Sequence, residues 1–139
     1  MGVIGSVVRP WCRCLVLALA VGACSATGPD QPGSWSSEQA SLTVGAEGTV
    51  LKILAAESCY GAFGEITGAI PSGSFRLAGT LTQLTGAFPG RIVYPATFVG
   101  SVAGRQIVIG VEIPSNQTTL GPYTLTKSAP QPWEACRFP

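Results

Sequence analysis

Histidine is absent from the chain, and acidic residues are few. The 139 residues include no histidine, and a single aspartate, Asp30, stands among seven acidic residues. Catalysis by Ser-His-Asp or Cys-His groups and most zinc sites require histidine, so these are excluded. No glycine motif of the phosphate-binding type is present. None of the scattered glutamates lies in a recognisable catalytic motif; they include Glu47, Glu57, Glu65, Glu112 and Glu134. We therefore expect a protein that is not an enzyme and that holds no cofactor or metal ion.

Charge of either sign is also scarce. Charged residues make up 11% of the chain, with 8 Lys and Arg against 7 Asp and Glu, and the basic ones are widely spaced. Binding to nucleic acid requires clustered Lys and Arg to neutralise phosphates. We therefore expect no nucleic-acid partner. The chain is apolar enough to fold, and its length allows one domain with one core.

The N-terminal segment has the pattern of a secretory signal peptide. Residues 1–14 carry Arg9 and Arg13 and no acid, and residues 15–21 form an apolar run that ends in small residues. A basic segment, a short apolar segment and small residues are the three parts of such a signal. The run is shorter than the about 20 residues that span a bilayer. We expect an N-terminal signal helix within residues 1–23.

The end of this segment, Val21-Gly22-Ala23-Cys24, resembles the lipobox of bacterial lipoproteins. Small side chains before the cut let a peptidase approach the backbone, and the thiol accepts a diacylglycerol. The resemblance implies that Cys24 becomes the lipid-carrying first residue, anchored in a membrane of the cell envelope. If the cell has two membranes, Ser25 resembles the signal for sorting to the outer membrane, on its periplasmic face or at the surface.

Five cysteines are present, and their fates differ on this interpretation. Cys12 and Cys14 leave with the leader, and Cys24 takes the lipid. The remaining pair, Cys59 and Cys136, lies in an oxidising compartment, so we predict that they form a disulfide.

Composition divides the mature chain into two parts. Residues 24–34 are rich in Gly, Pro and Ser and show no periodicity, which predicts a flexible lipidated tether. Residues 35–139 show alternation of apolar and polar residues, broken by turn residues, which predicts one β-domain. The strands are expected at 41–44, 50–56, 64–70, 74–81, 91–102, 105–113 and 120–127, with a weaker one within 133–138.

Short connections between seven or eight short strands favour a small antiparallel up-and-down β-barrel, with a β-sandwich as the alternative. The clearest strand, 105–113, alternates Ile107, Ile109 and Val111 on one face. Pro95 lacks an amide donor, so the strand over 91–102 needs a bulge, a bend or an edge at that point.

Two resemblances support this architecture. Gly33-Ser34-Trp35, followed by residues 41–48, resembles the first hairpin of avidin-like and lipocalin-like barrels, in which the indole plugs the barrel end. The whole mature chain is similar to a family of short bacterial lipoproteins. That similarity is carried by Trp35, Cys59, residues 79–82, residues 98–104, residues 123–126 and Cys136. The family implies a barrel and no particular activity.

Three functions fit these expectations. The first is a non-enzymatic envelope lipoprotein that binds a protein or surface partner. The second is a lipocalin-like carrier of a small apolar ligand, which requires a cavity lined by Phe75, Leu77, Phe98, Ile107, Ile109 and Tyr123. The third is an inhibitor of an envelope-targeting hydrolase. In a domain this small, aromatic side chains are expected to fill the core and plug the barrel ends rather than to line a ligand cup.

Overall fold

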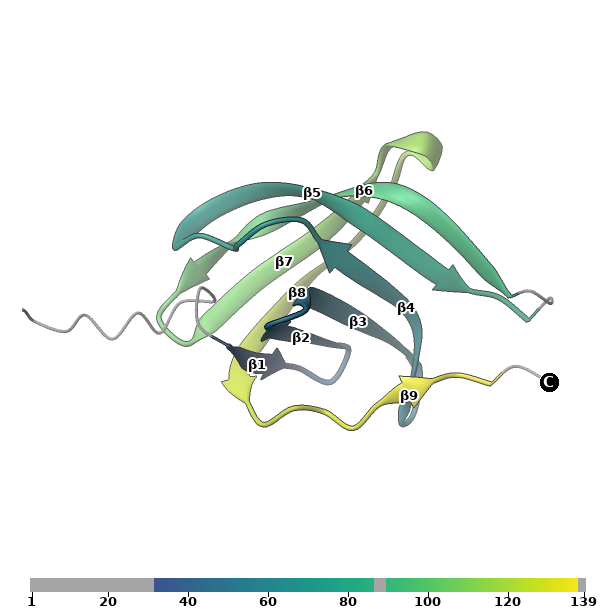
Figure 1. The fold of residues 1–139 in the computed structure, drawn as a ribbon, viewed down its shortest axis with the longest axis horizontal. Helices are drawn as coiled ribbons and strands as arrows, with labels where there is room; N and C mark the ends of the chain where they lie inside the picture. The colour runs from purple at the N-terminus through teal and green to yellow at the C-terminus, as the bar shows by residue number, and fades with distance from the viewer. Residues whose placement is uncertain (1–31, 87–89, 138–139) are drawn as a thin grey trace, which may run out of the picture.

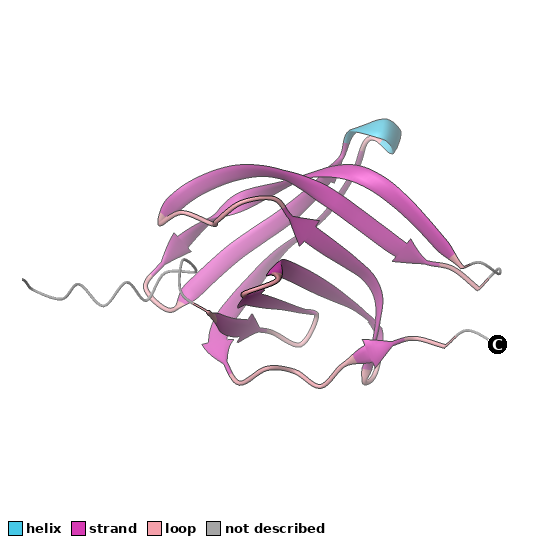
Figure 2. Cartoon of the chain, viewed as in Figure 1, coloured by secondary structure: helices cyan, strands magenta, loops and turns pink. Residues whose placement is uncertain are grey.

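The computed structural model describes residues 32–86 and 90–137. The expected signal helix, the lipidation site Cys24 and most of the tether lie outside these residues. Strand dominates the described part, and one short 3-10 turn, η1 (Pro114–Asn116), is present (Figure 2). The strands are β1 (Gly33–Ser36), β2 (Ala40–Gly45), β3 (Gly48–Ala56), β4 (Cys59–Ile66), β5 (Gly73–Leu84), β6 (Arg91–Ala103), β7 (Gln106–Ile113), β8 (Thr118–Ser128) and β9 (Glu134–Ala135).

Eight of these strands close into one antiparallel barrel (Figure 1). Each of β1 to β8 pairs with its neighbour in the sequence, and β8 pairs back onto β1. The prediction of an up-and-down barrel is confirmed, and the sandwich alternative is wrong. Closure pairs the strand edges that an open sheet would leave exposed. The ninth strand, β9, runs parallel to the start of β4.

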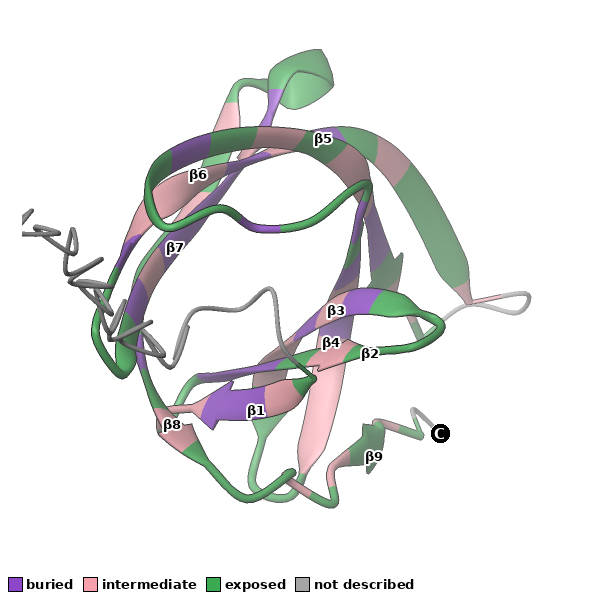
Figure 3. Ribbon diagram, turned by 60° about the vertical axis from the view of Figure 1, so that its left-hand side comes forward, coloured by how far each residue is buried: buried purple, intermediate pink, exposed green. Residues whose placement is uncertain are grey.

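The two-residue period of the strands selects the core. Ile107, Ile109 and Val111 are fully buried, as their alternation in the sequence predicts. In β6, Ala96 and Phe98 point to the same interior. Figure 3 shows buried positions alternating with more exposed ones along these strands. Seventeen buried apolar residues form a single cluster, so the barrel interior is its hydrophobic core.

The ring of Phe98 fills space that two glycines leave open. A Cβ atom on Gly64 would lie 2.5 Å from both Cε1 and Cζ of that ring, and one on Gly79 would lie 2.8 Å from its Cε2. Gly79 belongs to β5 and Gly64 to β4, which pair with each other. The aromatic side chain of β6 therefore packs directly onto the backbone of the neighbouring strand β5 and of β4 beyond it.

Two boundaries differ from the sequence-based expectation. The strand expected over 64–70 is β4, which begins earlier, at Cys59, and ends at Ile66. Beyond it the chain leaves the sheet, and Ile70 is fully buried in the loop that follows. The first strand begins at Gly33, so the last two residues of the expected tether already belong to the barrel.

The C-terminal segment, residues 129–137, crosses the outside of the barrel and is called the strap below. Cys136 forms the predicted disulfide with Cys59, 77 positions earlier in the chain. Gln131 Nε2 donates a hydrogen bond to Ser36 Oγ at 3.2 Å. Lys52 Nζ donates to the carbonyl oxygen of Trp133 at 3.2 Å. The strap is thus fastened to β1, β3 and β4, and the disulfide prediction is confirmed.

Candidate binding surface at the far end of the barrel

The two ends of the barrel differ in how the chain reaches them. Residue 32, the first described residue, precedes β1, so β1 starts at what we call the entry end. Antiparallel pairing places the turns between β2 and β3, β4 and β5, and β6 and β7 at that same end. The opposite end, called the far end, carries the β1–β2 turn, the β3–β4 turn, the β5–β6 hairpin and η1. In Figure 1 the β5–β6 hairpin and η1 extend toward the right, away from the start of β1.

Side chains close the entry end. The indole of Trp35 is fully buried there, as the resemblance to avidin-like hairpins implies. Lys127 Nζ lies 5.3 Å from the centroid of the Trp35 ring, a distance at which the ring face attracts a cation. Ile70, from the loop after β4, is also fully buried. Trp35 Nε1 has no hydrogen-bond partner within the described part of the chain. This end is therefore sealed by apolar packing.

The far end has a notch in its wall. The pairing of β1 with β8 stops at Ser36 and Thr126, while β8 continues back to Thr118. A cavity of about 390 Å³ opens above the short β1–β2 hairpin. Its lining comes from the β1–β2 turn, β3 and β8: Gln39, Ile53, Leu54, Gly121, Pro122 and Tyr123. Burial raises the pKa of the Tyr123 phenol above its ordinary value, because the charged form loses hydration.

The β5–β6 hairpin extends past its neighbour on one side. The pairing of β6 with β7 begins only at Thr97, opposite Glu112, whereas its pairing with β5 continues to Arg91. Residues 91–95, called the β6 edge, therefore have β5 on one side and no strand of the described residues on the other. Ile92 is 44% exposed and Val93 is 59% exposed, and they are the exposed large hydrophobic residues of the described part.

Aromatic side chains and a lysine gather on the outer wall below this edge. Lys52 Nζ lies 4.8 Å from the ring centroid of Tyr60. The rings of Tyr60 and Phe63 meet edge to face, with their centroids 6.2 Å apart. Phe63 pairs with Thr82 across β4 and β5, and Thr82 pairs with Val93 across β5 and β6. One row of outward positions thus joins the aromatic cluster to the β6 edge.

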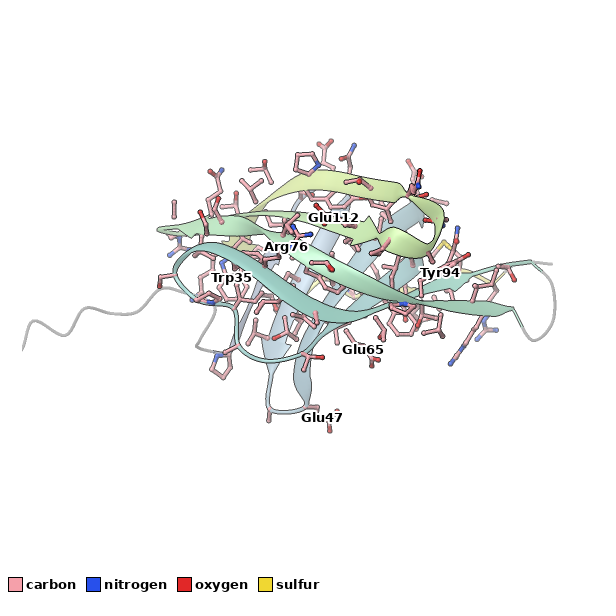
Figure 4. All side chains as sticks on the ribbon, turned by 90° about the horizontal axis from the view of Figure 1, so that it is seen from above. Trp35, Glu47, Glu65, Arg76, Tyr94 and Glu112 are labelled. Atoms are coloured by element: carbon pink, nitrogen blue, oxygen red, sulfur yellow. A yellow bond between two sulfur atoms is a disulfide. The ribbon has the colours of Figure 1, made fainter. Side chains whose placement is uncertain are left out.

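The acidic residues that the structure describes lie on the outer surface of the barrel. Glu112 is bound by Arg76 at 2.5 Å on the outer wall, where Figure 4 shows them side by side. Glu47 and Glu65 line a second open pocket, of about 440 Å³, around the β2–β3 turn; both are exposed, so water can solvate their charges. Glu57 and Glu134 are exposed elsewhere on the surface. In residues 32–86 and 90–137, no three His, Cys, Asp or Glu residues come together to hold a metal ion.

The residues expected to surround a ligand lie in the packed interior. Phe75, Phe98, Ile107 and Ile109 are buried members of the core cluster. Leu77 and Tyr123 are partly buried and pack against the same cluster, and only Tyr123 reaches the notch. Among the aromatic residues, Tyr60, Phe63 and Trp133 lie on the outer wall instead of in the core, while Phe88 and Phe138 lie outside the described residues.

Sequence reasoning did not identify the notch or the β6 edge. One signal was available for the edge: Pro95 cannot donate a hydrogen bond, and an edge was one of the three explanations for it. The structure gives Pro95 one pairing partner, Thr80 of β5. No comparable signal marks the notch, because it follows from the unequal lengths of strands far apart in the chain.

Comparison with sequence families, curated proteins and solved structures gave no significant match. The similarity to short bacterial lipoproteins therefore stays a prediction. No helix in the described part of the chain is both long enough and apolar enough to cross a membrane.

Proposed function

We propose that this chain is a lipid-anchored protein of the cell envelope, without a catalytic role, that binds a partner at the far end of its barrel. The observation that carries this proposal is the difference between the two ends. Trp35, Ile70 and Lys127 close the entry end. The far end carries a notch and two exposed aliphatic side chains, Ile92 and Val93. Among the described residues these are the large apolar side chains that the fold leaves uncovered, and uncovered apolar surface marks candidate binding sites.

Anchoring at Cys24 would orient the barrel. Residue 32 lies eight positions after Cys24, and a fully extended chain over that distance reaches at most roughly 30 Å. The entry end would then stay close to the bilayer, and the far end would point away from it. A partner in the surrounding envelope would therefore meet the notch and the β6 edge first.

A small apolar ligand is the second candidate, and the notch is the observation that favours it. Its volume of about 390 Å³ falls within the range of sites for small molecules, and because it opens to solvent a ligand there would stay partly exposed. Ile53, Leu54 and Pro122 would contact the apolar part of such a ligand, and Gln39 would supply a hydrogen-bonding group. This arrangement supports a ligand in the wall at the far end, since the barrel interior is occupied by the core cluster.

Site-specific photo-crosslinking in cells tests the proposal. A photoreactive residue is placed in the full-length chain at Val93 on the far end, or at Ala103 as the matched control. Both positions are exposed and belong to β6, but Ala103 lies at the entry end. We expect one defined covalent adduct from position 93 and none from position 103. Equal adducts from both positions, or adducts from position 103 alone, would contradict binding at the far end.

A further inference from the structure

Two features coincide on the β6 edge. The exposed large hydrophobic residues of the described part, Ile92 and Val93, are consecutive in the sequence. They also lie where β6 has a strand neighbour on one side only. The other unpaired stretch of barrel strand at the far end, in β8, exposes Thr119, Gly121, Pro122 and Thr124, none of which is a large aliphatic residue. Exposed aliphatic side chains thus mark one of the two edges.

Hydrogen-bond alternation shows which backbone groups this edge presents. Thr85 N donates to Gly90 O at 2.8 Å, so this pair is hydrogen-bonded. Pairs in an antiparallel ladder alternate between hydrogen-bonded and non-hydrogen-bonded. Ile92 and Tyr94 therefore bond to β5, while Arg91 and Val93 direct their N–H and C=O groups away from it.

Pro95 is consistent with this alternation. Position 95, like 91 and 93, directs its backbone groups away from β5, so the missing N–H of proline costs no hydrogen bond to β5. The outward edge accordingly offers two amide donors, on Arg91 and Val93, and three carbonyl acceptors. Its length is limited as well, since β7 occupies the same side of β6 from Thr97 onward and η1, which follows β7, also contacts β6. Five residues of strand span about 17 Å.

We propose that the β6 edge pairs in antiparallel fashion with an extended segment of a partner protein that has an aliphatic residue opposite Val93 and an acidic residue opposite Arg91. This inference rests on the proposed function and specifies the partner. Arg91 is exposed and forms no ion pair within residues 32–86 and 90–137. The described residues of the hairpin from Leu81 to Pro95 contain no acid. A carboxylate on the added strand would therefore meet an uncompensated positive charge.

Charge and hydrogen bonding also disfavour a second copy of this chain as the occupant. A symmetric antiparallel pair centred on Val93 would set Arg91 of one copy against Pro95 of the other. Proline has no charge and no amide proton. Arg91 would therefore gain no ion pair there, and its carbonyl oxygen would accept no hydrogen bond from Pro95. Strand addition by a different protein uses the whole edge, with backbone bonds giving affinity and side chains giving specificity.

Two defined peptides serve as probes of the full-length protein in detergent. Each is a heptapeptide of serine and threonine with valine at its fourth position; one has glutamate and the other lysine at its sixth. Antiparallel pairing of that valine with Val93 places the sixth residue opposite Arg91. We expect the glutamate peptide to bind about fivefold more tightly than the lysine peptide, as for an exposed ion pair. Binding should slow amide exchange at Arg91 and Val93 and leave Ile92 and Tyr94 unchanged.

Three variants separate the edge from the rest of the far end. Val93→Pro removes an outward amide that β5 does not use, and we expect it to abolish peptide binding. Thr124→Pro is the matched control on the unpaired part of β8, and binding should persist. Arg91→Glu, an exposed substitution that leaves the edge amides intact, should reverse the preference to the lysine peptide even if the proline variant folds poorly.

Each other outcome overturns the inference. Equal binding of the two peptides, or a preference that Arg91→Glu does not reverse, removes the charge argument. Protection of the Arg91 and Val93 amides that grows with protein concentration in the absence of peptide identifies a second copy as the occupant. Loss of binding in Thr124→Pro but not in Val93→Pro moves the peptide to the notch. That last result would leave binding at the far end intact while refuting the role of the β6 edge.

Discussion

Adding one methyl group at Gly64 should destabilise the barrel through the ring of Phe98. In Gly64→Ala the new Cβ would lie 2.5 Å from Cε1 and Cζ of Phe98, closer than real Cβ atoms approach. The carbonyl oxygen of Thr80, at 3.7 Å, is at ordinary contact distance. The fully buried ring has little room to move. Overpacking of this kind costs about 1–3 kcal/mol of unfolding free energy.

The cause of that cost can be isolated by shortening the side chain that collides. Phe98→Leu alone removes part of the buried ring and should cost on the order of 1–2 kcal/mol. In the Phe98→Leu background, however, the methyl group of Gly64→Ala has space. We expect the double variant to be more stable than the sum of the two losses predicts, with a coupling of about 1–2 kcal/mol.

Gly79→Ala is the matched control, because its methyl would also collide with the backbone oxygen of Glu65, which Phe98→Leu does not move. Urea unfolding with the disulfide intact, followed by tryptophan fluorescence, measures each free energy, since Trp35 is fully buried. Additive losses for Gly64→Ala and Phe98→Leu, within about 0.5 kcal/mol, would refute the packing of the Phe98 ring onto Gly64.

Three further predictions concern the strap, the notch and the outer wall. Cys136→Ala should lower unfolding free energy by roughly 4–5 kcal/mol, because a crosslink over 77 positions restricts the unfolded chain; an unchanged urea midpoint would contradict the disulfide's role. Burial raises the pKa of Tyr123 above 10.0, so the fold favours the neutral phenol. The stability that the neutral phenol contributes is complete below pH 10.0 and is lost as the pH rises through the raised pKa of the folded state. In Tyr123→Phe, the melting temperature should fall less steeply with alkaline pH. Arg76→Ala removes an ion pair whose side chains are 65% and 35% exposed, and it should shift stability by less than about 1 kcal/mol; a larger shift in urea unfolding would argue against solvent screening.

The alternation of apolar residues carries most of the information about this fold. Strands such as β7 could be placed from the sequence because one face is buried and the other is not. Apolar residues such as Ile107 and Ile109 therefore recur at every second position, the spacing of a strand. The start of β4 was missed because Gly61 and Gly64, which admit close packing, interrupt that period. The disulfide was predicted from the expected oxidising compartment and from the number of cysteines left after the leader and Cys24.

The candidate binding surface was less accessible from the sequence. Exposure of Ile92 and Val93 depends on where β7 ends, and the notch depends on where β1 ends, so both arise from differences between strand lengths. In the sequence, Ile92 and Val93 look like residues of any buried strand. Only the pairing of β6 with its neighbours distinguishes an aliphatic edge from an aliphatic core.

Mass spectrometry of the protein isolated from its source cells tests the proposed lipid anchor most directly. We expect a chain that begins at Cys24 and carries a diacylglycerol on its thiol and an acyl group on its amine. Residues 24–139 of the sequence would then account for the remaining mass, with Cys59 and Cys136 oxidised. A chain that retains residues 1–23, or one that begins at Cys24 without lipid, would contradict the anchored orientation on which binding at the far end depends.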